Sequence, residues 1–259
     1  MSIKVNRIGE RNINNFGSEM VIVKYRINKN IDVYFPEYNY TVKGVQYSNF
    51  KGGRVSCPYE RRVFGVGYIG EGEYKPTENG KHTRAYKTWH GMLQRCYEGK
   101  FQNKHPTYKD CEIDKNWLNF QEFGEWNSKN YYEVKDERIE LDKDILVKHN
   151  KIYSPNTCIY VPKTINMLFT KRQNDRGESP IGTSLTQNGK YKVQCCIINP
   201  ETGKPKQEYL GLYDTQEKAF EVYKYYKEKN IKEVANYYKG LIPQILYDAL
   251  YNYEVEIDD

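Results

Sequence analysis

The sequence predicts an α+β protein in three parts: a small N-terminal β module, a central strand-loop-strand-helix segment, and a C-terminal three-stranded sheet packed on a long helix. Three observations predict it. Alternating apolar and polar residues, broken by Asn and Gly, fill the first part. A helical apolar stripe replaces this alternation after Ala85. Alternating runs return around an Asn-Gly pair and lead into a long helical pattern.

The first part, residues 1–73, is predicted to be a compact, barrel-like β module. Its runs, EMVIVKYRINKNIDVYF and YTVKGVQYSNF, have the composition of strands and turns. The Gly-rich join GVGYIGEGEYKPTENGK follows and includes an Asn-Gly turn signal. It lacks the Gly-Lys-Ser/Thr ending of a phosphate-binding loop. We therefore place a domain boundary near residue 73.

The second part, residues 74–172, begins with two predicted helices. Trp89, Met92, Leu93 and Cys96 form one apolar stripe within AYKTWHGMLQRCY, and WLNFQEFGEW carries a second, aromatic stripe. Core packing explains both stripes. A strand in RIELDKDIL, a turn-rich loop in KHNKIYSPN, a strand in TCIYVP and a helix in KTINMLFTKR follow.

The third part, residues 173–259, is predicted to contain three antiparallel strands and a long helix. The strands lie within IGTSLTQNGKYKVQCCIINPETGKPKQEYLGLYDT, where Asn-Gly and Thr-Gly pairs mark the turns. Thr215 is the predicted N-cap of the helix, and Gly240 closes it.

Composition narrows the classes of protein that the chain can be. The 259 residues include 26 Tyr and only 9 Phe, and the formal net charge is +6. The aromatic content argues against a disordered chain, and no stretch of 18 apolar residues or signal-like N-terminus occurs, so we expect a cytoplasmic protein without a membrane partner. The basic bias permits a polyanionic partner, and the tyrosine hydroxyls suit stacking and phosphate contacts.

The six cysteines contain no C-x-x-C pair, so we expect reduced and mostly buried thiols. A mixed metal site built from Cys96, Cys111 and Cys158 stays open, because all three lie in the middle of the chain.

Oxygen-bearing side chains gather in the strand-loop-strand-helix block. Asp142 ends the first predicted strand, Asp144 follows two residues later, Asn156 lies in the turn before the second strand, and Asn166 lies in the helix. Hard oxygen ligands on a strand and a helix that fold together suit Mg²⁺ with open positions for phosphate and water. Solvated strand-end acids and a common turn asparagine are the structural alternative.

This block resembles the HNH, or ββα-metal, nucleases, specifically their phage homing-type members. The resemblance is carried by LDKDI, YSPNTC and Asn166, together with the upstream WHGMLQRCY and WLNFQEF, and covers most of residues 84–172. It implies hydrolysis of DNA phosphodiesters with Mg²⁺ or Mn²⁺, with Asp142 and Asn166 as metal ligands and Asn156 bracing the loop.

One position departs from the family pattern. Lys143 stands where these enzymes usually carry the general-base histidine, and a solvated lysine with a pKa of ~10.4 cannot accept a proton at neutral pH. The base is therefore expected elsewhere. His105 is the first choice, and His90, Tyr108 and His149 are the alternatives.

The third part resembles the AP2-type DNA-binding domain through Gly182, Gly189, Lys190 and Tyr191, followed by the stretch from Tyr209 to Ala219. The resemblance implies a sheet that enters the major groove of DNA. The predicted DNA contacts are Lys190, Lys192, Gln194 and Lys206, with Lys143 from the second part. The strands contain no arginine, which argues against strong guanine recognition, and a solvated structural sheet is the alternative.

The sequence thus predicts a cytoplasmic, phage-type HNH-like homing endonuclease that acts on double-stranded DNA in the host bacterium. Nicking by a monomer and double-strand cleavage by a homodimer both stay open. Lys143 favours a second hypothesis, a catalytically degenerate DNA-binding or regulatory factor. A third hypothesis is a phage anti-defence factor that binds a host protein through its tyrosine-rich surface.

Overall fold

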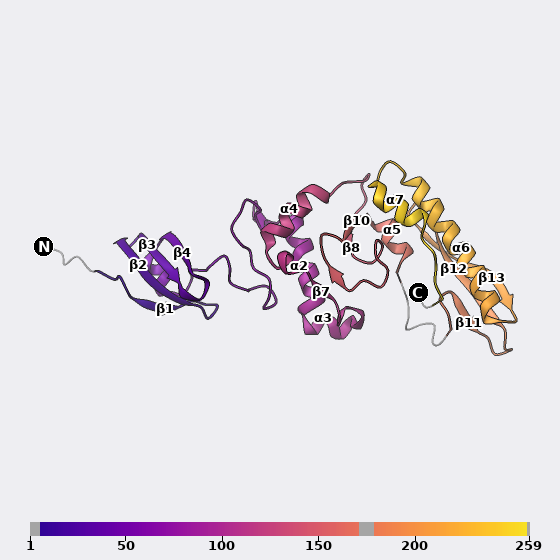
Figure 1. Ribbon diagram of the computed structural model, residues 1–259, viewed down its shortest axis with the longest axis horizontal. Helices are drawn as coiled ribbons and strands as arrows, with labels where there is room; N and C mark the ends of the chain where they lie inside the picture. The colour runs from indigo at the N-terminus through magenta and orange to yellow at the C-terminus, as the bar shows by residue number, and fades with distance from the viewer. Residues whose placement is uncertain (1–5, 171–178, 258–259) are drawn as a thin grey trace. The chain divides into compact units, whose positions relative to one another are not determined.

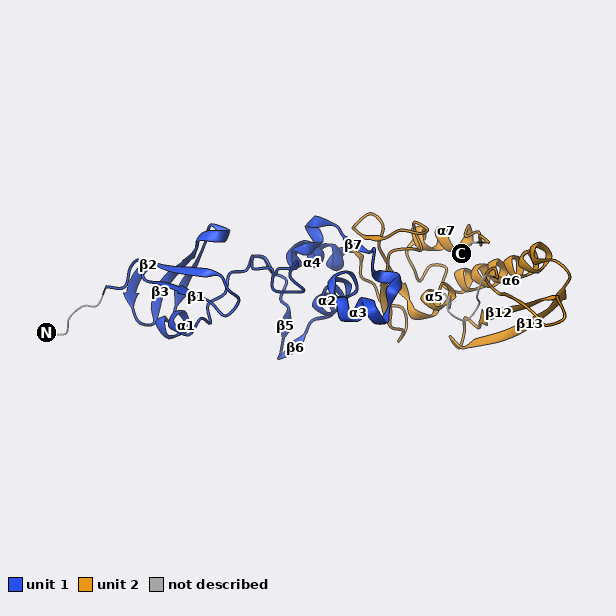
Figure 2. Cartoon of the chain, turned by 90° about the horizontal axis from the view of Figure 1, so that it is seen from below, with its two compact units in different colours: residues 1–129 blue, residues 130–259 orange. Residues whose placement is uncertain are grey.

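The computed structural model describes residues 6–170 and 179–257 (Figure 1). The chain divides into two compact units, Met1–Lys129 and Asn130–Asp259 (Figure 2). Both units mix helices and strands, so the predicted α+β class is confirmed. The three-part division differs from these two units, because their boundary falls inside the predicted second part, between its helical half and its strand-loop-strand-helix half.

Unit 1 opens with an antiparallel sheet in the order β1 (Arg11–Ile13), β2 (Glu19–Ile27), β3 (Asn30–Phe35) and β4 (Tyr40–Val45). Among the described residues this sheet is open, with β1 and β4 at its edges, whereas the sequence predicted a barrel-like module. A 3-10 turn, η1 (Pro36–Tyr38), joins β3 to β4, and a short helix, α1 (Tyr47–Lys51), follows β4. The core of the module is Met20, Ile22, Ile31, Val33, Phe35, Phe50, Val55 and Cys57.

The Gly-rich join is irregular, as predicted, but it is hydrogen-bonded into unit 1. Tyr68 donates its backbone N–H to Leu118 and accepts that of Phe120, both at 2.9 Å. Asn79 and Gly80 adopt positive φ of 50° and 73° between β5 (Thr77–Glu78) and β6 (Lys81–His82), which is the geometry of a tight hairpin turn. The join is therefore part of the packed unit.

The helical half of unit 1 follows the predicted apolar stripes. Its elements are α2 (Arg84–Tyr97), α3 (Gly99–Lys104), η2 (Pro106–Tyr108), β7 (Glu112–Ile113), η3 (Lys115–Leu118) and α4 (Phe120–Asn130). Thr83 caps α2 by accepting the backbone N–H of Tyr86 at 3.3 Å. The stripe of Trp89, Met92, Leu93 and Cys96 is buried, which confirms its assignment to the core.

Unit 2 holds the remaining elements: β8 (Ile139–Asp142), β9 (Ile152–Tyr153), β10 (Ile159–Pro162), α5 (Lys163–Leu168), β11 (Thr183–Leu185), β12 (Tyr191–Ile198), β13 (Pro205–Tyr213), α6 (Gln216–Tyr237) and α7 (Gln244–Tyr251). Strands β8 and β10 pair antiparallel, with Asp142 opposite Ile159. A separate antiparallel sheet has the order β11-β12-β13. The sequence did not predict α7.

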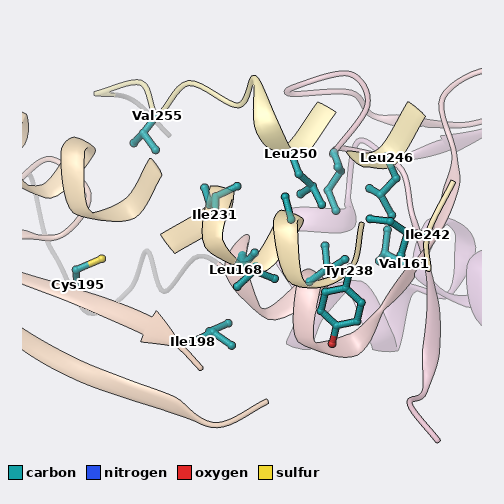
Figure 3. Packing of buried hydrophobic residues seen from close by; sticks show 14 of the residues in the cluster. Val161, Leu168, Cys195, Ile198, Ile231, Tyr238, Ile242, Leu246, Leu250 and Val255 are labelled. Atoms are coloured by element: carbon teal, nitrogen blue, oxygen red, sulfur yellow. The ribbon is translucent and has the colours of Figure 1, made fainter. Parts of the chain in front are cut away.

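One hydrophobic core joins the two sheets of unit 2. Leu168 of α5, Ile198 of β12, Ile231 of α6 and Leu250 of α7 all belong to it (Figure 3). The boundary predicted between residues 172 and 173 therefore separates elements that share one core, since the apolar faces of β10 and α5 are buried together with those of the second sheet and its helices.

Helix α6 is fixed to β12 by a buried asparagine. Thr215 caps the helix by accepting the N–H of Lys218 at 3.2 Å, as predicted, and the helix ends at Tyr237, ahead of Gly240 with its φ of 79°. The side chain of Asn230 accepts the backbone N–H of Ile198 and donates to its carbonyl, both at 2.9 Å. An amide thus continues the hydrogen bonding of the strand.

Across the described ranges, none of the helices combines the length and the apolar character needed to cross a membrane.

Candidate functional site

Asp142 is the last residue of β8, and its carboxylate organises the turn that follows. One oxygen, Oδ1, accepts the backbone N–H groups of Asp144 and Ile145, both at 2.8 Å. Burial raises the pKa of Asp142, and these two hydrogen bonds offset part of that effect. The fold therefore holds a desolvated carboxylate in a fixed orientation, and such a group gains from a nearby cation.

Asn166 of α5 is tied to the same strand through Glu140. Its Nδ2 donates to Glu140 Oε2 at 2.6 Å, while Arg138 Nε lies 3.1 Å from Glu140 Oε1. Glu140 and Asp142 are two residues apart on β8 and so project from one face of the strand. The structure thus places Asn166 on a helix that contacts the strand carrying Asp142. Glu140 was missed from the sequence, although the acid-apolar-acid alternation of ELD was its signal.

Lys143 points into the loop between β8 and β9. Its side chain is only 8% exposed; its Nζ donates to the carboxylate of Asp144 and, at 2.8 Å, to the carbonyl of Asn150. Lys143 was predicted to contact DNA, but in the structure its ammonium is enclosed by the protein. The physical reason is that the loop supplies both an anion and a carbonyl to neutralise it.

The same loop is braced by asparagine, at a position other than the predicted one. Asn150 donates Nδ2 to the carbonyls of Lys143 and Ile152 at 2.9 and 2.7 Å. Asn156 is exposed in the turn before β10, where Ser154 and Thr157 hydrogen-bond to each other at 2.8 Å. Asn150 was not predicted from the sequence, because an isolated loop asparagine carries no pattern.

The predicted general bases do not share a unit with Asp142, with one exception. His105, His90 and Tyr108 belong to unit 1, where His105 packs on Phe101 with ring centroids 4.5 Å apart. His149 is in unit 2, in the loop after β8, with Nε2 3.8 Å from a carboxylate oxygen of Glu256.

The predicted DNA contacts of the third part lie on β12, on β13 and in the turn before β12. Lys190 Nζ is 3.1 Å from the exposed Asp214, and Lys206 Nζ is 3.2 Å from the half-buried Glu208, so each charge is shared with an acid. Lys192 is half-buried opposite Leu212, and Gln194 lies opposite Tyr209. Tyr209 is 60% exposed beside Gln194 and was not among the predicted DNA contacts.

The cysteines form no disulfide among the described residues, and five of the six are buried. Cys96 and Cys111 lie in unit 1 and Cys158 lies in unit 2. Burial raises the pKa of Cys158 to about 12, so this thiol stays protonated. No group of three or more His, Cys, Asp and Glu side chains suited to a metal ion occurs in residues 6–170 and 179–257.

The donors around β8 are fewer than such a group needs: they are the carboxylate of Asp142 and the amide oxygen of Asn166, whose nitrogen is bonded to Glu140. These are hard oxygen donors of the kind that Mg²⁺ prefers, and the carboxylate of Asp142 is desolvated. The residues present therefore fit a divalent cation.

Comparisons of the chain with models of protein families, with curated proteins and with solved structures found no match.

Proposed function

We propose that the protein is an endonuclease that hydrolyses DNA phosphodiesters with the aid of Mg²⁺ or Mn²⁺. The observation that carries the proposal is the connection between β8 and α5: Asp142 ends the strand, and Asn166 of the helix bonds Glu140 of the same strand at 2.6 Å. When bound, a divalent cation would supply positive charge to the phosphate oxygens during cleavage.

Each of the three side chains has a distinct task in this proposal. Asp142 would hold the cation directly, because its orientation is fixed by the N–H groups of Asp144 and Ile145. Glu140 engages Nδ2 of Asn166, which leaves the amide oxygen of Asn166 as the atom available to a cation. Glu140 is therefore a positioning residue, and Asp142 and Asn166 are the proposed metal ligands.

DNA is the proposed partner because the β11-β12-β13 sheet and its turns carry exposed cations and an exposed aromatic ring. Lys190 and Lys206 are exposed, and Tyr209 projects beside Gln194. Ammonium groups contact phosphates, while amide and aromatic side chains contact bases. We include Lys192 in this surface and omit Lys143, whose ammonium is buried.

A second candidate function is DNA binding without cleavage. It is favoured by Lys143, which occupies the position of the usual base and is held by Asp144 and Asn150. In this case the strand-loop-strand-helix block would serve as a scaffold for binding.

The test is incubation of the purified full chain with supercoiled plasmid and Mg²⁺ or Mn²⁺, with EDTA as a control. The variants are Asp142→Ala and Asn166→Ala, and Glu221→Ala on the exposed side of α6 is the matched control. We expect metal-dependent nicks or breaks for the wild type and the control, and a loss of about a hundredfold or more in the two site variants, the scale of a missing electrostatic group. Mn²⁺ binding measured by calorimetry should weaken in the same variants.

The outcomes separate the candidate functions. DNA that is retarded in a gel but uncut under all metal conditions supports the binding factor. Undiminished cleavage by Asp142→Ala excludes the proposed site. A chain that binds no DNA at moderate salt favours the protein-binding, anti-defence function. Sedimentation of the active species then distinguishes a nicking monomer from a dimer.

A further inference from the structure

A cavity of about 340 Å³ lies within unit 2, separate from Asp142 and Asn166. It is bounded by the end of α5, by β12 and β13, by α6 and by the segment after α7. Figure 3 shows Leu168, Ile198, Ile231 and Val255, which line it from four of these segments. The volume falls at the lower end of the range for small-molecule sites.

Lys227 contributes the charge of this cavity. It lies on the buried stripe of α6, one helical turn from both Tyr223 and Ile231, and is only 9% exposed. Within the described ranges no carboxylate hydrogen-bonds or ion-pairs with its Nζ, and the titratable groups that act on it are the thiols of Cys195 and Cys196. Burial lowers the pKa of Lys227, because those thiols do not replace the lost hydration of an ammonium.

The neighbouring polar residue on the same helix shows that the fold satisfies such groups elsewhere. Asn230, three residues along, is also buried and makes two hydrogen bonds of 2.9 Å to Ile198. Buried polar groups in folded proteins are normally paired in this way. Lys227 therefore stands out as a donor that faces a cavity.

The remaining lining defines what would pair with it. Ile198, Ile231, Leu168 and Val255 form apolar walls, and Gln194 and Gln207 are the amides at the cavity. One ammonium neutralises one negative charge, so a monoanion matches the site better than a phosphate dianion. The apolar walls require an apolar body on the ligand.

We propose that unit 2 binds a small organic monocarboxylate, with the carboxylate on Lys227 and an aliphatic or aromatic body between α6 and β12. The site uses none of the residues assigned to the metal, and it shares only Gln194 with the proposed DNA surface. Its charge, from Lys227, and its apolar walls belong to neither, so the proposal does not depend on nuclease activity. The ligand would stabilise the packing of α6 on the sheet, because it neutralises the buried ammonium.

The test is calorimetric titration of the full chain with octanoate, with 1-octanol and octylamine as ligands of the same body but different charge. We expect the Kd of octanoate to be at least about tenfold lower than that of either of the other two ligands. Lys227→Met should lose this preference, and Lys227→Arg should keep it. Lys229→Met, on the exposed side of the same helix, is the matched control and should bind like the wild type.

Two results would overturn the proposal. One is an equal octanoate affinity in the wild type and in Lys227→Met, when circular dichroism shows that both proteins are folded. The other is the absence of binding for octanoate, benzoate and the fluorescent monoanion anilinonaphthalene sulfonate at millimolar concentration. Neither result depends on DNA cleavage, so this proposal and the proposed nuclease fail separately.

Discussion

Two lysines in the described part of unit 2 are buried, in different surroundings. Lys143, 7% exposed, lies in the loop after β8 and meets the carboxylate of Asp144 and the carbonyl of Asn150. Lys227, 9% exposed, faces a cavity with apolar walls and two thiols nearby. A lysine neutralised by its own loop serves the structure, whereas a buried lysine with no carboxylate partner in the described ranges is the one that we assign to an external anion.

The two acids of β8 show the same contrast with the opposite charge. Glu140 is paired with Arg138 and bonded to Asn166. Asp142 accepts two backbone N–H groups, but burial still raises its pKa. The acid that remains desolvated is again the one that we assign to an external ion.

The largest effect is expected where a fully satisfied buried group is removed. Asn230→Ala leaves the N–H and carbonyl of Ile198 unpaired in the core. We expect a loss of about 2–4 kcal/mol in the free energy of unfolding, since each unpaired buried group costs about 1–3 kcal/mol. Urea unfolding measures it. The exposed variant Lys229→Ala is the control. If Asn230→Ala lowers the free energy of unfolding no more than this control does, within experimental error, Asn230 does not anchor the helix.

Lys143→Met removes the buried lysine whose charge is neutralised by its own loop. The carbonyl of Asn150 and the carboxylate of Asp144 lose their partner, so we expect a loss of about 1–3 kcal/mol. The cost is moderated because Asp144 is half-exposed and can be hydrated. Thermal unfolding measures this loss, and Lys163→Met, a substitution of an exposed lysine, is the control. Unchanged stability would mean that Lys143 is not a structural residue.

Lys227→Met removes the buried lysine that has no carboxylate partner among the described residues. It should change the free energy of unfolding in the opposite direction to Lys143→Met. We expect a gain of about 1 kcal/mol at neutral pH, because a buried charge is replaced by an apolar chain of similar length. The folded pKa of Lys227 is lowered, so the cost of its charge is complete below that pKa and disappears as pH rises towards the unfolded value of ~10.4. Urea unfolding between neutral and alkaline pH should show the advantage of the variant shrinking. An advantage that grows with pH contradicts the assignment.

Asp142→Asn should give the smallest change, less than about 1 kcal/mol. The folded pKa of Asp142 is raised, so its ionised form is disfavoured by the fold. The variant should match the wild type below about pH 4 and become the more stable protein as pH rises through the raised pKa. The measurement is thermal unfolding in EDTA. If the wild type is instead the more stable of the two at neutral pH, Asp142 is an ordinary, well-neutralised acid.

Much of the fold was predictable because its signals are local. The stripe of α2, the Asn79–Gly80 turn and the Thr215 cap are each encoded within one or two helical turns or a hairpin. The strand-loop-strand-helix order from β8 to α5 was also predicted, and with it the positions of Asp142 and Asn166. Helix α7 was missed from the sequence; it is short, and its buried leucines, Leu246 and Leu250, join a core that includes the preceding helix, α6.

The sequence by itself determined the α+β class, the strand-loop-strand-helix order from β8 to α5 and the residue types of the proposed metal site. Only the tertiary structure decided that the two sheets of unit 2 share one core, that Asn166 bonds Glu140, and that Lys143 turns inward while Lys227 meets a cavity. The physical reason is range. Periodicity and capping act over a few neighbouring residues, whereas burial and the pairing of a charge depend on which distant segments the folded chain brings against it.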